Sequence, residues 1–341
     1  MTRPSARHRP ADAKAPAGLV YLATEDLTIS RQRGTLGWRY YDGGGKRVTD
    51  RETIDRLDGI ALPPAYSDGR FADDPRGHLQ AVGMDARGRR QYRYHSDFRD
   101  AREDSKFDAC RAFGEALPAI RKRVERNLKA GRPDREAVLA AVVRLLDTAL
   151  LRVGNEAYAQ SNKSFGVTTL RTRHAKVKRG ALMLSYRGKS GIERRVRLTD
   201  ASLLRIVRRC QDLPGQRLFQ YRDEAGEAHR IESSDVNAWL RETSGGDFTA
   251  KHFRTFHASV IAFATLRGGA GLGAMLEAVS EALGNTPSIA RKSYVHPRLI
   301  EAAKSGELVG HELPRPTRYL TSEERGLIVW LGKRPRRRVS A

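Results

Sequence analysis

A set of arginine, lysine and tyrosine residues in the last two thirds of the chain has the types needed for chemistry at a phosphate group. Its members are Arg152, Lys189, Lys251, Arg254 and Tyr294. A tyrosine oxygen has an ordinary pKa of about 10, so it becomes a good nucleophile only where neighbouring positive charge favours the phenolate. Arginine offers a planar fork of donors that stabilises negative charge on non-bridging phosphate oxygens. Residues of these types can serve phosphoryl transfer, but each of them alone is a weak signal, because a tyrosine at helical spacing is usually a core or surface residue.

The spacing of the last members of this set predicts helices. Lys251 and Arg254 are three residues apart and share one face if their segment is helical. Thr286-Pro287 is typical of a helix start, with threonine at the cap and proline in the first turn. Tyr294 then stands near the end of a short helix, about two turns beyond Asn285.

Several other catalytic classes lack their motifs in this sequence. There is no GxxxxGK[ST] phosphate loop, so ATP hydrolysis is not indicated. The glycines between residues 269 and 273 follow a helical stretch rather than a strand, and they predict an interhelical loop. Neither an HExxH helix nor a carboxylate cluster with two-metal spacing stands out. We therefore expect no metal site, and a metal-dependent nuclease is not supported.

The composition predicts a folded protein with a polyanionic partner. The chain has 341 residues, 39% of them hydrophobic, and its 63 Lys and Arg against 40 Asp and Glu give a formal net charge of +23. Such a surplus is typical of nucleic-acid binding. Cys110 and Cys210 are too few for a disulfide framework or a zinc cluster and indicate a reducing compartment. Without a signal peptide or an apolar span, we expect a soluble, cytoplasmic protein.

The local patterns predict one β-rich and one mainly helical part. The glycine turn at 42–45 predicts a hairpin between residues 38–41 and 46–48, and residues 91–94 alternate as a strand does. The prolines between residues 62 and 66 predict a rigid connector.

Long helical periods begin near residue 97. One helix is expected to begin at Pro133-Asp134 and to carry Arg152 at its end. Residues 166–198 are expected to return to β-structure, including a strand at 168–170 and a turn at 187–191. Helices are then predicted from residue 201 onward.

Together these patterns predict an α+β protein with a small β-rich N-terminal domain and a larger, mainly α-helical domain that holds a β-hairpin or small sheet. The predicted divisions are a disordered basic tail over 1–18, the β-rich domain over 19–96, the helical domain over 97–332 and a basic tail over 333–341.

Five segments of this chain resemble, in order, those of the type IB DNA topoisomerases of the poxvirus-like bacterial group. They are residues 77–81 with 91–94, residues 151–156 with 162–170, residues 187–189, residues 253–255, and residues 293–294. One such segment alone is weak evidence, whereas five in the right order are specific. The resemblance covers nearly the whole chain and implies a DNA-clamping β domain followed by a catalytic domain of the fold shared with tyrosine recombinases.

This resemblance implies a role for each member of the set. Tyr294 matches the nucleophile that forms a 3′-phosphotyrosyl bond, and Arg152 and Arg254 match the two arginines that stabilise five-coordinate phosphorus. Lys189 matches the general-acid lysine, which protonates the departing 5′ oxygen. Lys251 matches a further positive contact at the scissile phosphate. Because the phosphotyrosine ester retains the bond energy, resealing is expected to need neither ATP nor a metal ion.

Two positions depart from the family pattern. Asn285 stands nine residues before Tyr294, where the poxviral members have a histidine. An amide can donate to a phosphate oxygen but cannot carry positive charge. We therefore expect Asn285 to contact a phosphate without an acid–base role. His252 stands where similar sequences often have aspartate, and the sequence gives no account of its effect.

The resemblance also implies how the protein meets double-stranded DNA. Gln91, Tyr92 and Tyr94 are expected in the major groove, with Arg90 among the arginines on phosphates. The two domains are expected to close as a C-shaped clamp around the duplex. The expected protein is a monomer of the bacterial nucleoid that relaxes positive and negative supercoils by transient cleavage of one strand.

Two alternatives remain open at this point. A tyrosine recombinase uses the same arginine, lysine and tyrosine chemistry, but its N-terminal domain is usually helical, whereas residues 19–94 are predicted to be β-rich. A catalytically silent nucleoid-binding protein explains the net charge, but it does not explain the ordered set of Arg152, Lys189, Arg254 and Tyr294.

Overall fold

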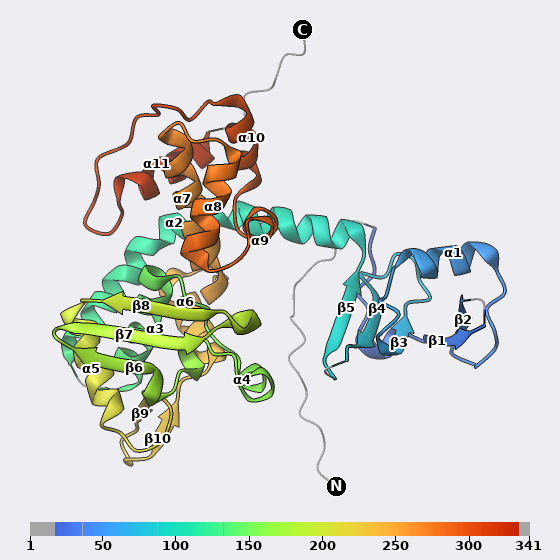
Figure 1. The fold of residues 1–341 in the computed structure, drawn as a ribbon, viewed down its shortest axis with the longest axis horizontal. Helices are drawn as coiled ribbons and strands as arrows, with labels where there is room; N and C mark the ends of the chain where they lie inside the picture. The colour runs from blue at the N-terminus through green and yellow to red at the C-terminus, as the bar shows by residue number, and fades with distance from the viewer. Residues whose placement is uncertain (1–17, 36, 87, 132, 334–341) are drawn as a thin grey trace. The chain divides into compact units, whose positions relative to one another are not determined.

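The computed structural model describes residues 18–35, 37–86, 88–131 and 133–333, and the chain divides into two compact units near residue 106 (Figure 1). Both units combine helices with antiparallel strands, which confirms the predicted α+β class. The tails predicted at 1–18 and 333–341 lie outside the described residues, apart from Gly18 and Lys333. No helix within the described ranges is both long and apolar enough to cross a bilayer.

The N-terminal unit is built on one five-stranded antiparallel sheet with the strand order β2-β1-β3-β4-β5. One α-helix, α1, lies between β2 and β3 in the chain, and the sequence patterns did not predict it. Asp50 caps this helix by accepting a hydrogen bond from the Thr53 N–H. The element bounds are β1 Ile29–Gly34, β2 Gly37–Tyr41, α1 Arg51–Gly59, β3 Ser67–Phe71, β4 Leu79–Met84 and β5 Arg90–Tyr94.

Of the hairpin predicted around residues 42–45, the turn is confirmed and the second strand is wrong. The turn is present, because the Asp42 carboxylate accepts from the N–H groups of Gly44 and Lys46, each at 2.9 Å. The chain beyond the turn makes only an isolated bridge, Tyr41 to Arg47, whereas the full ladder of β2 is with β1. The turn therefore leads toward α1 instead of into a second long strand.

The C-terminal unit contains a three-stranded sheet, a two-stranded hairpin and most of the helices (Figure 1). The long helix α2 begins in the N-terminal unit and continues into this one. The strands are β6 Ala175–Lys178, β7 Ala181–Arg187, β8 Glu193–Leu198, β9 Gln220–Arg222 and β10 Ala228–Arg230. The helices are α2 Ser96–Ala130, α3 Arg135–Ala149, α4 Glu156–Asn162, α5 Ala201–Gln211, α6 Ser233–Ser244, α7 Ala250–Arg267, α8 Leu272–Leu283, α9 Pro287–Ser293, α10 Pro297–Ser305 and α11 Ser322–Gly332.

The core of this unit is organised around α3. This helix is capped by Asp134, and its apolar side chains are buried along nearly its whole length. It ends earlier than predicted: Leu150 adopts the left-handed conformation, with φ of 52°, and turns the chain out of the helix. Arg152 therefore lies in the extended segment beyond the helix and not at its end.

Two further sequence predictions are wrong in this unit. Residues 167–169 form a short 3-10 turn instead of a strand, because the hydroxyl and backbone groups of Thr169 bond locally to Gly166. The helical region beyond residue 201 is interrupted by the β9–β10 hairpin. In contrast, β7, β8 and the turn between them lie where the alternating pattern predicted them.

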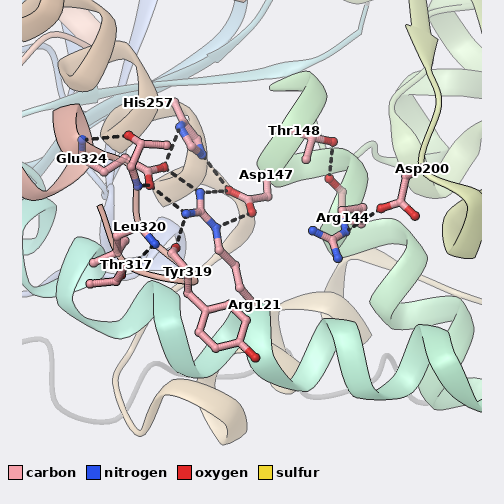
Figure 2. Close-up of polar contacts among 11 residues, drawn as sticks. Arg121, Arg144, Asp147, Thr148, Asp200, His257, Thr317, Tyr319, Leu320 and Glu324 are labelled. Carbon is pink, nitrogen blue, oxygen red and sulfur yellow. Dashed lines mark hydrogen bonds and ion pairs between the residues drawn. The ribbon is translucent and has the colours of Figure 1, made fainter. Parts of the chain in front are cut away.

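A buried ionic cluster joins four helices of this unit (Figure 2). Arg121 of α2 binds Asp147 of α3 through Nε and Nη2 at 2.8 and 2.9 Å, and Glu324 of α11 through Nη1 and Nη2 at 2.8 and 2.7 Å. Its remaining Nη1 proton is directed at the Tyr319 carbonyl, at 2.5 Å. His257 of α7 contacts Asp147 through Nε2 at 2.8 Å. All five guanidinium donors therefore have acceptors.

The cluster keeps Asp147 ionised. Burial favours the neutral acid, but the bonds and charges of His257 and Arg121 outweigh it and hold the pKa of Asp147 well below its usual range. A depressed folded-state pKa contributes stability that is present above the unfolded pKa of about 3.9 and is lost as the pH falls below it. The cluster therefore stabilises the helices at neutral pH and weakens in acid.

We predict that Asp147→Asn lowers the free energy of unfolding by about 3 kcal/mol at pH 7, because it leaves Arg121 facing one carboxylate only. Urea denaturation measures the loss, and the difference from wild type should shrink between pH 4 and pH 2. Glu301→Gln, which breaks the exposed pair with Lys304, is the control and should leave the midpoint unchanged. Equal midpoints for Asp147→Asn and wild type would contradict a stabilising role for the cluster.

Candidate active site

Tyr294 lies at the C-terminal end of α9, where the sequence predicted it. Thr286 caps this short helix by accepting from the Ile289 N–H, and Pro287 occupies the first turn. The Tyr294 N–H closes the last turn on the Ala290 carbonyl at 3.0 Å. The side chain is half-buried, so its phenol group lies at the edge of the core rather than within it.

Arg254 lies against Tyr294 and is held by the ends of two other helices. Its guanidinium stands over the tyrosine ring, 4.9 Å from the centroid, and donates a hydrogen bond to the phenol. Nη1 donates to the carbonyl of Leu150, just past α3, and Nη2 to that of Leu283, the last residue of α8, at 3.0 Å. Such terminal carbonyls have no partner within their own helices. One buried arginine thus fixes α3, α7 and α8 around the phenol.

The segment that carries Arg152 is fixed by the turn that follows α4. The Arg152 carbonyl accepts from the Val167 N–H at 2.9 Å, and the Val153 carbonyl accepts from the Thr168 N–H at 2.7 Å. The approach requires glycine at position 166, because a Cβ there would lie 2.6 Å from the Arg152 carbonyl oxygen. Residues 166–168 therefore hold the backbone of Arg152 in place.

Lys189 lies at the closed end of the β7–β8 hairpin. The Gly188 N–H donates to the Ile192 carbonyl at 2.8 Å, and Ser190 adopts a left-handed conformation with φ of 63°. The closed end of the hairpin is attached to the preceding loop, because the Phe165 N–H donates to the Arg187 carbonyl at 2.8 Å. The Lys189 side chain is exposed, and its charge nevertheless acts on the Tyr294 phenol.

The pKa values of two neighbouring tyrosines, Tyr294 and Tyr186, are shifted in opposite directions. Burial raises the pKa of the Tyr294 phenol, but the charges of Arg254, Arg152 and Lys189 and the hydrogen bond from Arg254 outweigh it, so the pKa is lowered overall. Burial also raises the pKa of Tyr186 of β7, and there the neighbouring arginines offset it only in part. Of the two phenols, Tyr294 therefore more readily becomes a phenolate.

Asn285 stands between α8 and α9 with an amide that makes no hydrogen bond. Its backbone N–H donates to the Ser280 carbonyl at 3.0 Å, whereas the side-chain Nδ2 and Oδ1 are both buried without a partner. The Nε of Arg254 is likewise buried and unpartnered. Native proteins rarely leave buried donors unsatisfied. The Nδ2 of Asn285 and the Nε of Arg254 are therefore two buried donors that an acceptor oxygen of a ligand could satisfy.

Lys251 and His252 occupy the first turn of α7. Lys251 is exposed, whereas Arg254 on the same helix is buried, so the two share a helix but not an environment. Lys251 is also not among the charges that act most strongly on Tyr294, within the described part of the chain. His252 has a structural role, because its Nδ1 accepts from the Thr249 N–H at 2.9 Å and caps the helix.

The predicted DNA-contact residues lie together on β5 of the N-terminal unit. Tyr92 and Tyr94 stack with their ring centroids 6.2 Å apart, and Tyr92 is 43% exposed. Gln91 lies on the other face and donates to the Asp85 carboxylate at 2.9 Å. Arg90 is exposed at the start of the strand.

The sequence analysis did not identify two residues that lie near Arg152 and Arg254, namely Tyr186 and Arg194. They face one another across β7 and β8, and the charge of Arg194 also acts on Arg254. Burial, with the charges of Arg152 and Arg194, lowers the pKa of Arg254 to about 10, so it stays protonated at neutral pH. The available signal was the alternation of the two strands, which places residues 186 and 194 on the inner face with Leu184 and Val196.

One group of three potential metal ligands is present among the described residues. Asp223, Glu227 and His229 converge on the β9–β10 turn, where His229 Nε2 lies 2.6 Å from Asp223 Oδ2. This group is mostly exposed and belongs to a different element from those that carry Tyr294.

The arrangement around Tyr294 is suited to attack on a phosphodiester. A phenol whose pKa is lowered lies beside a buried guanidinium with a free donor, an unpaired amide and the charges of Arg152 and Lys189. Preorganised donors of this kind stabilise charge that develops on phosphate oxygens. The described residues that act most strongly on the phenol are all cationic, so the site favours an anionic ligand.

In a comparison with known proteins, both units match family models of DNA topoisomerases. A family model described as the catalytic core of eukaryotic DNA topoisomerase I matches residues 95–293, and a model described as the N-terminal domain of bacterial DNA topoisomerase IB matches residues 37–85. The first match ends one residue before Tyr294.

Named relatives are found among viral enzymes. The chain is 32% identical over 225 residues to DNA topoisomerase 1B of Acanthamoeba polyphaga mimivirus, covering 65% of this chain and 67% of the relative. It is 24% identical over 230 residues to DNA topoisomerase 1B of vaccinia virus (strain Copenhagen), covering 65% and 72%. Since one family model spans more than half of the chain and the mimivirus relative is matched over two thirds of its length, the chain belongs to the type IB DNA topoisomerases.

Proposed function

We propose that Tyr294 is the nucleophile with which this type IB topoisomerase relaxes supercoiled DNA. The observation that carries the assignment is the position of its phenol under Arg254, with a pKa lowered by Arg254, Arg152 and Lys189 against the effect of burial. The family assignment favours this activity over the tyrosine recombinase, and the five-stranded N-terminal sheet agrees with that choice.

In the proposed reaction, the phenolic oxygen of Tyr294 loses its proton to water and forms a bond to phosphorus. The bond from phosphorus to the 5′ oxygen breaks, and Lys189 donates a proton to that oxygen. Arg152, Arg254 and Asn285 donate to the non-bridging oxygens while phosphorus is five-coordinate, and Lys251 adds a positive contact. The free strand end swivels, and the reverse sequence reseals the strand. Phosphoester bonds are exchanged one for one, so the cycle needs no nucleotide hydrolysis.

The substrate of this reaction is double-stranded DNA, held in part by the N-terminal unit. Tyr92, Tyr94 and Gln91 are proposed to contact the major groove, and Arg90 a phosphate. The formal charge of +23 supports such a partner. We further propose that the protein acts as a monomer on the bacterial chromosome, in keeping with the match of residues 37–85 to a bacterial family model.

The decisive test is plasmid relaxation in EDTA without ATP, with Tyr294→Phe beside wild type. Wild type should relax positive and negative supercoils, and Tyr294→Phe should bind DNA but relax neither, because only the phenolic oxygen is removed. Denaturing gels should show a covalent protein–DNA complex for wild type and none for Tyr294→Phe. Tyr186→Phe is the matched control and should still form the complex. Relaxation by Tyr294→Phe would refute the nucleophile assignment.

The unpaired amide of Asn285 gives a prediction with opposite effects on activity and stability. We expect Asn285→Ala to slow strand cleavage by about 10²-fold, the usual effect of removing one donor to a developing oxyanion. The unfolding midpoint should be unchanged or higher, because the side chain makes no hydrogen bond in the folded protein. Single-turnover cleavage and thermal denaturation measure the two effects. A cleavage rate equal to wild type would remove Asn285 from the site.

The role of Arg90 is tested by the salt dependence of DNA binding. Arg90→Ala should lower the slope of log K against log salt by about 1, because one phosphate contact is lost. Arg89→Ala removes the same formal charge, but that side chain is already paired with Asp85 at 2.7 Å, so its slope should match wild type. Equal slopes for all three proteins would exclude a phosphate contact at Arg90.

A further inference from the structure

Arg194 of β8 lies against the turn that carries Lys189. It is the cross-strand partner of Tyr186 and donates a hydrogen bond to that phenol. Its side-chain stem packs on Gly188, where a Cβ would lie 3.3 Å from the Arg194 Cγ. Arg194 is therefore in contact with the residue that precedes Lys189 in the chain.

The guanidinium of Arg194 extends from the hairpin to the junction of α8 and α9. Nη2 donates to the Ala282 carbonyl at 3.4 Å, a long hydrogen bond. The group also lies directly on Gly284, where any Cβ would overlap it. Gly284 ends α8 with φ of +59°, and Asn285 follows it. One side chain thus spans from the Lys189 turn to the segment that leads to Tyr294.

We propose that Arg194 is a positioning residue that holds the Lys189 hairpin against the α8–α9 junction, so that Lys189 reaches the same phosphate as Asn285 and Tyr294. This inference rests on the proposed function, in which Lys189 is the general acid. It adds a residue that the reaction depends on without assigning it a contact with the substrate.

The partners of Arg194 favour positioning over catalysis. Its donors are directed at two acceptors of the protein itself, the Tyr186 phenol of the hairpin and the Ala282 carbonyl of α8. Lys189 is exposed at the closed end of a hairpin, so its location depends on where the whole hairpin is held. A displacement of about 1 Å at a reacting group can cost 10²-fold in rate.

The geometry also explains why arginine is needed at position 194. A guanidinium presents donors in several directions from one plane, whereas a lysine ammonium is a compact point charge on a flexible stem. The flat group fits over Gly284, which has no side chain, while still reaching both acceptors. Arg194→Lys should therefore behave more like Arg194→Ala than like wild type.

The test is a double-mutant cycle on two substrates. A cleavage site is first mapped on plain duplex with wild type, and a second duplex then carries a bridging sulfur in place of the 5′ oxygen at that site. The sulfur leaves without needing a proton. Single-turnover cleavage is measured for wild type, Lys189→Ala, Arg194→Ala and the double variant. Arg195→Ala is the matched control, because Arg195 is the exposed neighbour on the opposite face of β8, paired with Glu193 at 3.1 Å.

We expect Arg194→Ala to slow cleavage of the ordinary duplex by about 10²-fold and to recover most of that loss on the sulfur duplex. The double variant should be no slower than Lys189→Ala, and Arg195→Ala should match wild type. Additive losses would overturn the inference. Where sulfur rescues Lys189→Ala, equal slowing of Arg194→Ala on both duplexes would also overturn it, because that result indicates a direct phosphate contact. If Lys189→Ala is not rescued by sulfur, the general acid assignment fails, and the coupling of the two substitutions still decides the role of Arg194.

Gly284→Ala provides an independent route to the same displacement, since the added methyl group occupies the place of the guanidinium. It should slow cleavage in the wild-type background and have no further effect on the rate in the Arg194→Ala background. An equal rate loss in both backgrounds would show that Gly284 acts through the backbone alone, and would overturn the proposed contact.

Discussion

The geometry of the catalytic unit depends on the buried ionic cluster of Arg121, Asp147, Glu324 and His257. Its members come from α2, α3, α11 and α7, and the guanidinium of Arg121 has an acceptor for every donor. A buried charge is tolerated only when it is paired and hydrogen-bonded in this way. The bidentate contacts therefore allow little freedom in how the four helices pack.

This cluster lies one helical turn from the site on each of two helices. Asp147 precedes Leu150, whose carbonyl receives a hydrogen bond from Arg254, and His257 follows Arg254 on α7. A shift of α3 relative to α7 would therefore disturb both the cluster and the anchoring of Arg254. The left-handed turn at Leu150 costs of the order of 1 kcal/mol. The bond from Arg254 to its carbonyl helps to offset that cost and links the helix end to the tyrosine.

The site concentrates positive charge and leaves donors unused. Arg254 is 3% exposed with charges of its own sign nearby, and the amide of Asn285 is buried without a partner. Both features cost stability in the protein alone. A phosphodiester supplies negative charge and acceptor oxygens, so binding it satisfies the same groups. In the proposed reaction, these groups stabilise the charge that develops during cleavage.

Much of this protein was determined by its sequence alone. The order of the segments around Arg152, Lys189, Arg254 and Tyr294 predicted the family, because each segment carries local chemistry at a fixed place in the chain. Strands β5, β7 and β8, and the start of α9 at Thr286-Pro287, follow from alternation and capping, which act over a few residues. The short helix α1 and the β9–β10 hairpin escaped prediction although both carry local signals. Asp50 caps α1, and the Asp223 carboxylate accepts from the Glu227 N–H in the turn of the hairpin.

Only the tertiary structure decided which residues surround the phenol. Tyr186 and Arg194 have no motif, and they join the site because antiparallel pairing places them opposite one another beside the end of α8. The opposite pKa shifts of Tyr186 and Tyr294 likewise depend on burial and on charges far away in sequence. Lys251 and Arg254 share a helix, yet packing buries one and exposes the other. Such properties depend on distances in space, which no local pattern of residue types specifies.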